Sequence, residues 1–463
     1  MTPFRPPRAL VARLACAAAG AGVLVAVLAS SGRGQAALPL DVAVRQALRD
    51  GPEAQIARLR TGAADDTAAA ARSIYWPRAT ISSQAGWSNR QDDTINAIDG
   101  QGRLKRYPLS TQGSSEPWIG VYVDQMLFDL RQWRAAEREA LEADAAVVAE
   151  AQQREVISAT VLDRYLDVVR LDGVVGLDRR RLADAEWLAH QSGVLLDAGR
   201  TLASERDQAV LEVEQVRLDA EQHRAELAEA QAALARAIGS EPGAPAPSIV
   251  AASLPVIVDA APPLDGDTAL AAAPELRILA LRCRMDELAV DMARAGRYPT
   301  LALRGGYFHY GTQRFDAFEQ EVAVGVDLQV PVFDGFQASN SIDGASKAAA
   351  AARLRLETLR DEKQARAGEL QRRLRVALQQ PALAERRASM AAERQRLADL
   401  SVQGQRGSVA QALTARGEAS RAAQAALDAQ LERVRAWAAL QREQGRLAAA
   451  LVGEPAAEAA VAP

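Results

Sequence analysis

The sequence predicts a mainly α-helical chain with a small β part, arranged as two tandem structural repeats. An internal duplication is the first sign: the alternating segment 117–129 leads directly into a long charged, alanine-rich stretch, and 322–334 does the same about 205 residues later. Composition is the second, because aromatic residues make up only 4% and charged residues 25% of the chain, which favours extended helices over a large compact core. Each repeat should therefore hold a strand hairpin and a long coiled-coil helical hairpin, giving four strands per chain.

The first 36 residues resemble a secretory signal peptide. Arg5, Arg8 and Arg13 form a basic region, and the apolar run 15–29 is short for a membrane span. Cleavage is expected before Ala37, with a second candidate site after Ala29; a retained anchor is the alternative. Removal of residues 1–36 takes the formal charge from −4 to −8, which gives no reason to expect nucleic-acid binding.

The first repeat, 37–239, should open with two helices separated by Gly51-Pro52. Asp41 is the expected N-cap of the first helix, and the second helix should run to about Ser73. A strand hairpin over 78–128 follows, with strands at 80–87 and 118–128. The residues between them, 88–116, are rich in Asn, Asp, Gly, Pro and Ser and predict a polar loop.

A coiled-coil hairpin is expected over 131–238. No proline occurs between Arg131 and Asp197, so a continuous helix there would reach roughly 100 Å. Val147, Val161 and Val168 recur by sevens along it. The returning helix, about 202–238, has apolar or small residues at alternating spacings of four and three, which is coiled-coil spacing; this seam comprises Ala209, Val213, Val216, Ala220, His223, Leu227, Ala230, Leu234 and Ala237.

The second repeat, 265–453, follows a Pro- and Ala-rich linker at 240–264 and repeats the plan. Helices are expected at 267–273 and 275–296, a strand hairpin at 300–332 and a coiled-coil hairpin at 338–452, in which Pro381 should kink the long helix 338–403. The return helix should cover 408–452. The tail 454–463 should be disordered.

The strands 118–128 and 322–332 have two different faces, in register between the copies. Valines and other apolar residues alternate with small or polar ones that include Asp124 and Asp327. Such a pattern fits a membrane β-barrel, and it equally fits a half-buried sheet of a soluble domain. Four strands cannot close a barrel, for which about eight are needed, so a membrane protein would require several chains to share one barrel.

No catalytic residues, metal site or cofactor are expected. Cys283 is the only cysteine after the signal region, so one mature chain has no disulfide framework. His190, His223 and His309 lie in unrelated places without metal-ligand spacing, and His223 is interpreted as a polar packing residue of the seam. Neither a Walker loop nor a Ser/His/Asp order stands in a suitable context. The chain is therefore predicted not to be an enzyme.

Several motifs occur in the same order in both repeats. Trp76-Pro77 and Tyr298-Pro299 enter the first strand of each hairpin, and Gly-Val followed by Phe-Asp marks both strand-to-helix junctions, at 120–129 and 325–334. Each repeat closes at a glycine, Gly239 or Gly453. This duplicated set resembles the outer-membrane efflux protein family, the TolC-like channels, over essentially the whole mature chain.

The resemblance implies a homotrimer in which three chains of four strands form a 12-stranded outer-membrane β-barrel on a periplasmic α-helical tunnel. It also implies that the hairpin tips, at 197–205 and 403–411, form the periplasmic aperture and meet a periplasmic adaptor (membrane fusion) protein that works with an inner-membrane pump. The implied docking residues are Gly199, Arg200, Thr201, Gly404, Arg406, Gly407 and Ser408. The sequence departs from the family pattern at Gln405, which stands where a second tip glycine is expected.

Four acids are candidates for the pore. Asp124 and Asp327 are expected to line the channel lumen, or else to lie on a solvated polar face. Glu205 and Asp207 could form a ring of acids at the trimer aperture. The alternative for this second pair is an ordinary helix N-terminus, where the helix dipole favours acids.

The predicted function is that of a passive exit channel of a tripartite efflux or type I secretion system, in the outer membrane of a Gram-negative bacterium and spanning into its periplasm. A periplasmic coiled-coil adaptor or scaffold without a membrane barrel is the alternative. Drugs, metals and polypeptides all leave through similar ducts, so the sequence does not identify the exported substrate.

Overall fold

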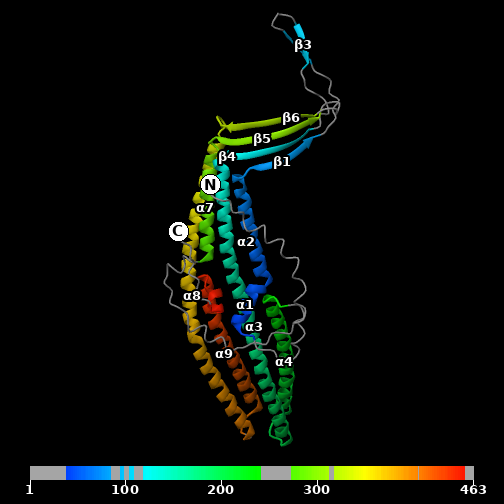
Figure 1. Cartoon of the computed structure of the whole chain (residues 1–463). Helices are drawn as coiled ribbons and strands as arrows, with labels where there is room; N and C mark the ends of the chain where they lie inside the picture. The colour runs from blue at the N-terminus through cyan, green and yellow to red at the C-terminus, as the bar shows by residue number, and fades with distance from the viewer. Residues whose placement is uncertain are drawn as a thin grey trace.

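A computed structural model describes residues 38–84, 94–98, 104–108, 118–240, 273–311, 318–404 and 406–453. The expected signal peptide, the linker beyond residue 240, the short helix 267–273 and the tail 454–463 lie outside the described residues. The chain is mainly helical, and a small sheet lies across one end of a set of long helices (Figure 1).

Two helices open the described chain, α1 (Leu40–Asp50) and α2 (Pro52–Ala71), followed by a short 3-10 turn η1 (Arg72–Tyr75). The expectation that Asp41 caps α1 is wrong. The helix begins one residue earlier, after Pro39, whose carbonyl accepts the Ala43 N–H, and the Asp41 carboxylate instead pairs with Arg45 at 2.8 Å. Proline holds φ near −65°, so Pro39 sets the entry to the helix without a side-chain cap.

The main sheet has four antiparallel strands in the order β1-β4-β5-β6. Its strands are β1 (Arg78–Gln84), β4 (Trp118–Phe128), β5 (Thr300–Gly311) and β6 (Phe318–Gln329). The hairpins of the two repeats therefore join directly, through pairing of β4 with β5. This leaves β1 and β6 as the two edges of the sheet.

The loop predicted at 88–116 is not entirely irregular. Strands β2 (Thr94–Ile98) and β3 (Leu104–Pro108) pair with each other in a separate antiparallel ribbon. The sequence carries a signal for this: the β-branched residues Thr94, Ile95 and Ile98 precede an Asp99-Gly100 dipeptide, and such dipeptides are frequent in turns. The polar composition of the segment concealed it.

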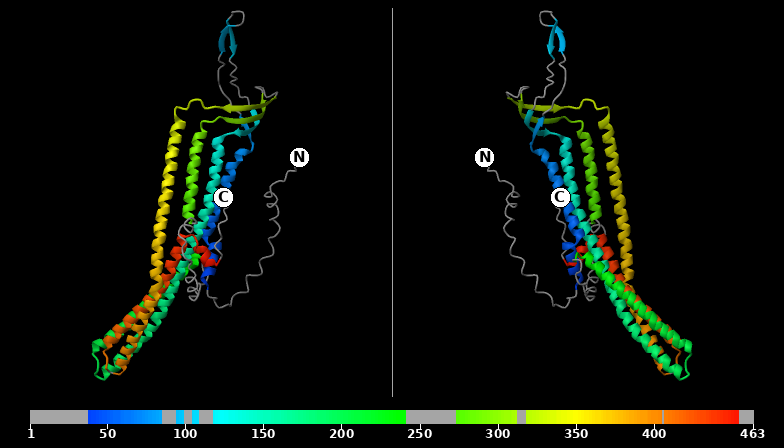
Figure 2. Two further views of the ribbon diagram at one scale, coloured as in Figure 1. Left: turned by 90° about the vertical axis from the view of Figure 1, so that its left-hand side faces the viewer. Right: turned by 90° about the vertical axis from the view of Figure 1, so that its right-hand side faces the viewer.

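Two very long helices run the length of the molecule, α3 (Leu130–Asp197) and α8 (Gln337–Gln403), and α8 is continuous through Pro381. Nearer the sheet they pack with α2 and with α7 (Pro274–Ala295), and farther away with α4 (Ala203–Ala237) and α9 (Val409–Glu443). The lower half is inclined to the upper half, and both helical turns lie at its end (Figure 2). None of the helices within the described ranges is long and apolar enough to cross a membrane.

The heptad pattern of α3 holds at mid-length and fails nearer the sheet. Val161 and Val168 are buried as expected, whereas Val147 is 53% exposed and its neighbour Val148 is buried. An α-helix drifts about 20° per heptad from a strict seven-residue repeat. The partners of α3 also change along its length, so one column cannot stay buried throughout.

The largest core lies at mid-length, where both repeats meet. It includes Leu40, Val44, Leu162, Tyr165, Leu166, Leu234, Leu431, Trp437 and Leu447. The Tyr165 hydroxyl donates a 3.0 Å hydrogen bond to the carbonyl of Leu38, which holds the start of the described chain against α3. This core joins the first helix, the last helix and both hairpins.

The return helix predicted over 408–452 is interrupted. It ends at Glu443, Gly445 adopts a left-handed φ of 66°, and α10 (Leu447–Val452) begins a new direction. The Glu155 carboxylate of α3 accepts the first N–H groups of α10, from Leu447 at 2.8 Å and Ala448 at 3.2 Å. Burial raises the pKa of Glu155 to about 6, and these hydrogen bonds oppose part of the rise.

Candidate functional site

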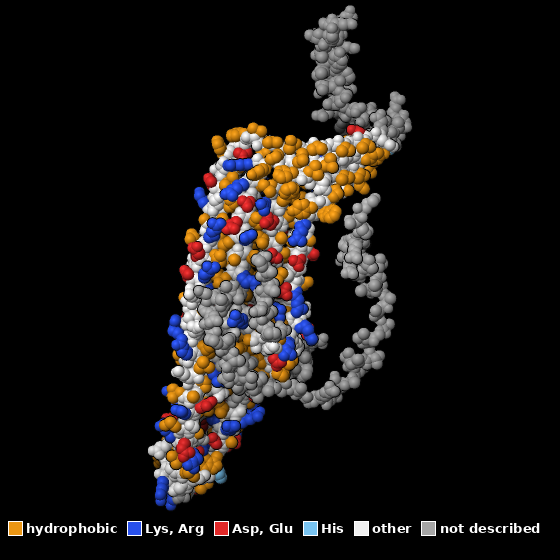
Figure 3. All heavy atoms as spheres, turned by 60° about the vertical axis from the view of Figure 1, so that its left-hand side comes forward, with side chains coloured by type: hydrophobic (Ala, Val, Ile, Leu, Met, Phe, Trp, Pro, Cys, Tyr) orange, Lys and Arg blue, Asp and Glu red, His pale blue; other side chains and the backbone are white. Residues whose placement is uncertain are grey.

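The sheet exposes an apolar face. Ile81 of β1 and Val324 of β6 are 71% and 75% exposed, and their neighbours on the same face share this exposure. They are Ile119, Val121, Val123, Leu303, Tyr307, Val322, Val326 and Leu328. Hydrophobic side chains gather over the strands in the space-filling view, while the helices below carry mixed charges (Figure 3). None of the described residues of this chain covers this face.

The opposite face holds both acids that the sequence singled out, together with an arginine that it missed. Arg304 of β5 stands directly opposite Asp124 of β4, and its guanidinium lies between the two acids. The Nη1 atom is 2.8 Å from Asp327 Oδ2, and Nε is 3.5 Å from Asp124 Oδ1. Alternation along the strand 301–310 puts Arg304 on the polar face of that strand. This pattern was the sequence signal by which Arg304 could have been found.

An aromatic pair lies one step farther along the same face. The Phe308 ring meets Tyr122 edge to face, with ring centroids 4.8 Å apart. It also covers Gly120 and Gly306, where an added Cβ would lie 2.6 Å and 2.5 Å from ring atoms. Both glycines are therefore needed for the ring to lie against the strands.

The first helical tip is closed by a glycine turn. Gly199 has φ 69°, its N–H binds the Leu196 carbonyl at 2.8 Å, and the Arg200 N–H binds the Leu195 carbonyl at 2.8 Å. These two bonds form a Schellman motif, which needs a left-handed residue at the position of Gly199. Arg200 is exposed beyond the helix end.

The second tip uses an equivalent hydrogen bond with different residues. The Arg406 N–H binds the Ser401 carbonyl at 2.9 Å, five residues back, as Arg200 does in the first tip. Gln405 itself lies outside the described residues. Gly407 follows with an N–H bond of 3.0 Å to the same carbonyl, and a Cβ at this position would lie 2.0 Å from Ser401 Oγ. The second tip therefore depends on the absence of a side chain at 407.

Glu205 brings predicted residues of both tips together. Its carboxylate accepts a hydrogen bond from Thr201 Oγ in its own tip and from Ser408 Oγ in the other tip, the latter at 3.4 Å. Ser408 in turn caps α9 by accepting the Ala410 N–H at 3.1 Å. Asp207 does not join them: it is exposed and pairs with Arg206 at 2.8 Å.

A small core supports the two tips from beneath. Leu188, Leu195, Ala209, Val402, Val409 and Ala412 are buried between the hairpins. Beside it, Arg416 forms a nearly buried ion pair with Asp399 at 2.9 Å and stacks over the Trp187 ring, 5.1 Å from its centroid. The tips are thus held to one another as a unit.

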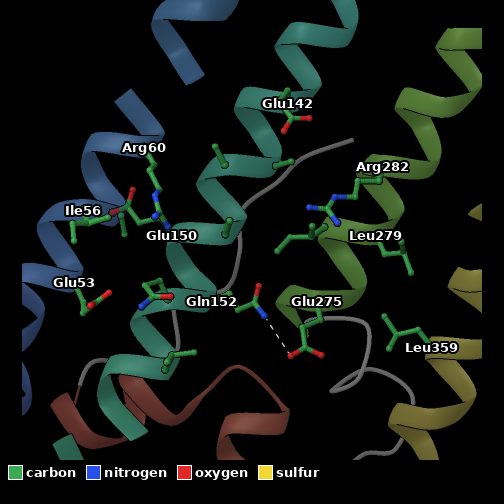
Figure 4. Close-up of a pocket in the computed structure, with 17 residues that line it drawn as sticks. Glu53, Ile56, Arg60, Glu142, Glu150, Gln152, Glu275, Leu279, Arg282 and Leu359 are labelled. Carbon is green, nitrogen blue, oxygen red and sulfur yellow. Dashed lines mark hydrogen bonds between the residues drawn. The ribbon is translucent and has the colours of Figure 1, made fainter. Parts of the chain in front are cut away.

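A cavity of about 700 Å³ lies at mid-length between α2, α3, α7 and one residue of α8 (Figure 4). Acidic and basic side chains alternate with leucine and isoleucine around it. Within it, Gln152 Nε2 donates to Glu275 Oε1 at 3.4 Å. The charged lining comprises Glu53, Arg60, Glu142, Glu150, Glu275 and Arg282.

Glu275 connects this cavity to a nearly buried lysine. Lys363 of α8, only 11% exposed, pairs with Glu275 of α7 and with Glu443 of α9, the second at 2.7 Å. Burial by itself lowers the pKa of Lys363, but the hydrogen bonds to the two carboxylates outweigh it, and the pKa is raised overall. This ion cluster ties three helices together where the upper and lower halves meet.

His223 lies in the seam between α3 and α4, where it was expected as a polar packing residue. His223 Nδ1 lies 2.7 Å from Asp178 Oδ2, a carboxylate that is 1% exposed, across the α3–α4 seam. His190 is exposed on α3. Within the described ranges, no group of three or more His, Cys, Asp or Glu side chains is placed to hold a metal ion.

Comparison with solved structures relates this fold to outer-membrane channels. The outer membrane protein VceC of Vibrio cholerae is 15% identical with a TM-score of 0.71, over 88% of this chain and 96% of that one. CusC, whose structures concern transmembrane channel formation, is 17% identical with a TM-score of 0.71, over 91% of this chain and 95% of that one. The open MtrE outer membrane channel of Neisseria gonorrhoeae is 18% identical with a TM-score of 0.67, over 88% of this chain and 89% of that one. No family model and no curated protein matches the sequence. At these identities the likeness establishes the fold, as the duplicated motifs predicted.

Proposed function

We propose that this protein is a passive exit channel: three copies form a 12-stranded outer-membrane barrel continued by a helical tunnel across the periplasm. It would be the outer component of a tripartite efflux or type I secretion system in a Gram-negative bacterium, working with a periplasmic adaptor and an inner-membrane pump. It would need no catalytic group. The solved structures of this fold are described as outer-membrane proteins and channels, which supports the proposal.

The two-faced sheet is the observation that carries the proposal. Its apolar face forms a contiguous exposed patch of a kind that monomeric water-soluble proteins rarely have, while its other face carries ion pairs. Transmembrane barrels have this arrangement, with apolar residues toward lipid and polar residues toward the lumen. Asp124 and Asp327 would then line the lumen, as the sequence suggested.

The edges of the sheet support a shared barrel. Among the described strands, β1 and β6 each have one neighbour only. Unpaired backbone groups are not tolerated within a bilayer, so each edge needs another strand. Because β1 and β6 run in opposite directions, β6 of one copy can pair antiparallel with β1 of the next, and three copies give twelve strands.

Exposed apolar stripes on two helices support the same assembly. Val376, Leu383, Met390 and Leu397 of α8 recur every seven residues and are 51–60% exposed. Leu211 and Leu218 of α4 form a matching stripe. Heptad spacing is typical of helices that pack against another helix. The two helices flank the lower half of the chain in Figure 1, so α8 of one copy would meet α4 of the next.

The tips would form the periplasmic aperture and the adaptor docking site. Arg200 and Arg406 are both exposed at equivalent points of the two turns, which suits contact with a partner. Glu205, joined to Thr201 and Ser408, would help to hold the aperture closed. Asp207, exposed beside it, would add negative charge to the entrance.

Channel formation tests the proposal directly. The protein purified in detergent should have the mass of three chains and, in a planar lipid bilayer, should give discrete conductance steps. A periplasmic adaptor without a barrel would remain in the soluble fraction and would not conduct. A monodisperse, water-soluble monomer without conductance would refute the channel.

The apolar helix stripes can be tested separately. Leu383→Arg combined with Met390→Arg should prevent the trimer, because charges would be buried at each helix contact. The exchange Leu383→Met with Met390→Leu keeps the stripe apolar and should leave the trimer intact. Native mass spectrometry in detergent distinguishes the two; trimers of undiminished stability in the arginine variant would rule out this contact.

A further inference from the structure

We propose that Arg304 is the residue that determines the charge selectivity of the lumen, by neutralising half of the charge of Asp124 and Asp327. The inference rests on the proposed channel, since the polar face of the sheet must line a pore. It concerns a residue on the central strand pair, β4–β5, whose guanidinium lies near one acid of β4 and one acid of β6. The ions that it affects are small inorganic ions and charged export substrates alike.

The geometry places one positive charge between two negative ones. Arg304 is opposite Asp124 in the strand register, and Asp327 is two residues along β6 from Gly325, the direct partner of Arg304. Gly325 leaves open space, because a Cβ there would have no atom within 4 Å. The arginine side chain can therefore reach diagonally to Asp327, at 2.8 Å, while it remains near Asp124.

Stability does not account for this arrangement. Arg304 is 64% exposed and the acids are 52% and 47% exposed, and such surface ion pairs contribute little to the stability of a protein. The groups also face open space rather than another element. Their accessible charge is thus the property that the arrangement preserves.

The field of the cluster would reach the centre of the pore at moderate salt. Twelve strands about 4.8 Å apart and tilted by about 40° enclose a backbone circle roughly 24 Å across, before side chains narrow it. The Debye length is about 10 Å at 0.1 M salt and about 3 Å at 1 M. A ring of charges on the wall therefore acts on passing ions at 0.1 M and is screened at 1 M.

Arg304 halves the net charge of this ring. In each copy the two acids and the arginine sum to one negative charge, and without the arginine they sum to two. Two other charged residues with described side chains share this face: Arg78 stands opposite Asp124 on β1, and Glu321 stands opposite Phe308, farther along β6. Counted over the whole described face, each copy carries one net negative charge with Arg304 and two without it. Loss of Arg304 would thus double the net negative charge of the ring, whereas loss of both acids would reverse its sign.

Reversal potentials in a KCl gradient test this inference. In single channels at about 0.1 M KCl, Arg304→Gln should raise the K⁺ to Cl⁻ permeability ratio by at least about twofold, and the difference should vanish at about 1 M. Arg304→Lys, the matched control, keeps the positive charge and removes only the planar guanidinium group. Its permeability ratio should stay near that of the parent protein. Asp124→Asn with Asp327→Asn should shift the preference toward Cl⁻.

The outcomes separate this inference from the channel itself. Arg304→Gln channels that form normally with an unchanged permeability ratio would overturn the role of Arg304 and leave the channel standing. If Arg304→Gln does not assemble, the double asparagine variant decides, since its channels must move toward Cl⁻. Absence of conductance in the parent protein would instead refute the proposed function.

Discussion

Replacement of Lys363 by methionine should weaken the junction between the two halves of the molecule more than any comparable change of an exposed charge. Methionine retains most of the volume and removes the ammonium group. The two carboxylates that Lys363 joins then lose their cation: Glu275, which can turn toward water, and Glu443, which is only 11% exposed. Glu443 would keep Arg366 alone, at 3.6 Å.

The expected loss follows from the burial of the remaining charge. Removal of one partner from a buried ion pair typically destabilises a protein by about 3–5 kcal/mol, because an unpaired charge stays in a poorly solvated place. Arg366→Ala, the matched control, removes a 69% exposed cation from the same carboxylate and should cost less than about 1 kcal/mol. Adding Glu443→Gln to Lys363→Met removes the unpaired charge and should restore most of the loss.

Guanidinium unfolding followed by the helical circular dichroism signal measures these differences in detergent. The order of stability should be parent, then Arg366→Ala, then the double variant, with Lys363→Met last. A Lys363→Met protein within about 1 kcal/mol of the parent would show that the cluster is solvated and would refute the reasoning. A double variant as unstable as the single one would refute the part assigned to Glu443.

Two further predictions concern the helix junction and the second tip. The folded-state pKa of Glu155, about 6, lies above the ordinary 4.5, so folding favours its protonated form; the free energy of unfolding should fall by about 2 kcal/mol in total as pH rises from well below 4.5 to well above 6, with about two thirds of the fall between these values. Unfolding titrations across this range should show the slope in the parent and not in Glu155→Gln, and equal slopes would exclude it. Gly407→Ala places a methyl group 2.0 Å from Ser401 Oγ, whereas at Gly404 the nearest atom is 3.3 Å away. Amide exchange at the tip should therefore speed up severalfold in Gly407→Ala and little in Gly404→Ala, and equal rates would contradict the steric argument.

Much of the fold could be predicted because its signals are local and occur twice. The proline-free run after Asp129 and the seam of α4 lie within single helices, where periodicity is sufficient. The strands followed from alternation, and the tip at Gly199 was implied by the family resemblance. The break at Gly445 was missed because only the tertiary partner of α10, Glu155, makes a new helix start favourable there.

The candidate site was predicted less completely, since its contacts cross between repeats. Asp124 and Asp327 were singled out by their equivalent positions in the two copies. Arg304 comes next to Asp124 only because β4 pairs with β5. Likewise Glu205 and Ser408 are 203 residues apart and meet only because both hairpins end at one level. No single-strand or single-helix pattern contains such pairings.

The duplication itself explains why identical copies can close around a pore. Each repeat supplies one hairpin, so the chain carries an even number of strands and its last strand opposes its first in direction. The seam between copies can then be antiparallel like every other pair in the sheet. The edge strand β6 leads directly into α8, and α8 and α4 lie on opposite sides of the lower half (Figure 1). Barrel and tunnel would therefore share one seam, and we expect charges introduced into the α8 stripe to abolish conductance as well as trimer formation. Conducting trimers of an arginine-substituted stripe would show that the two parts assemble independently.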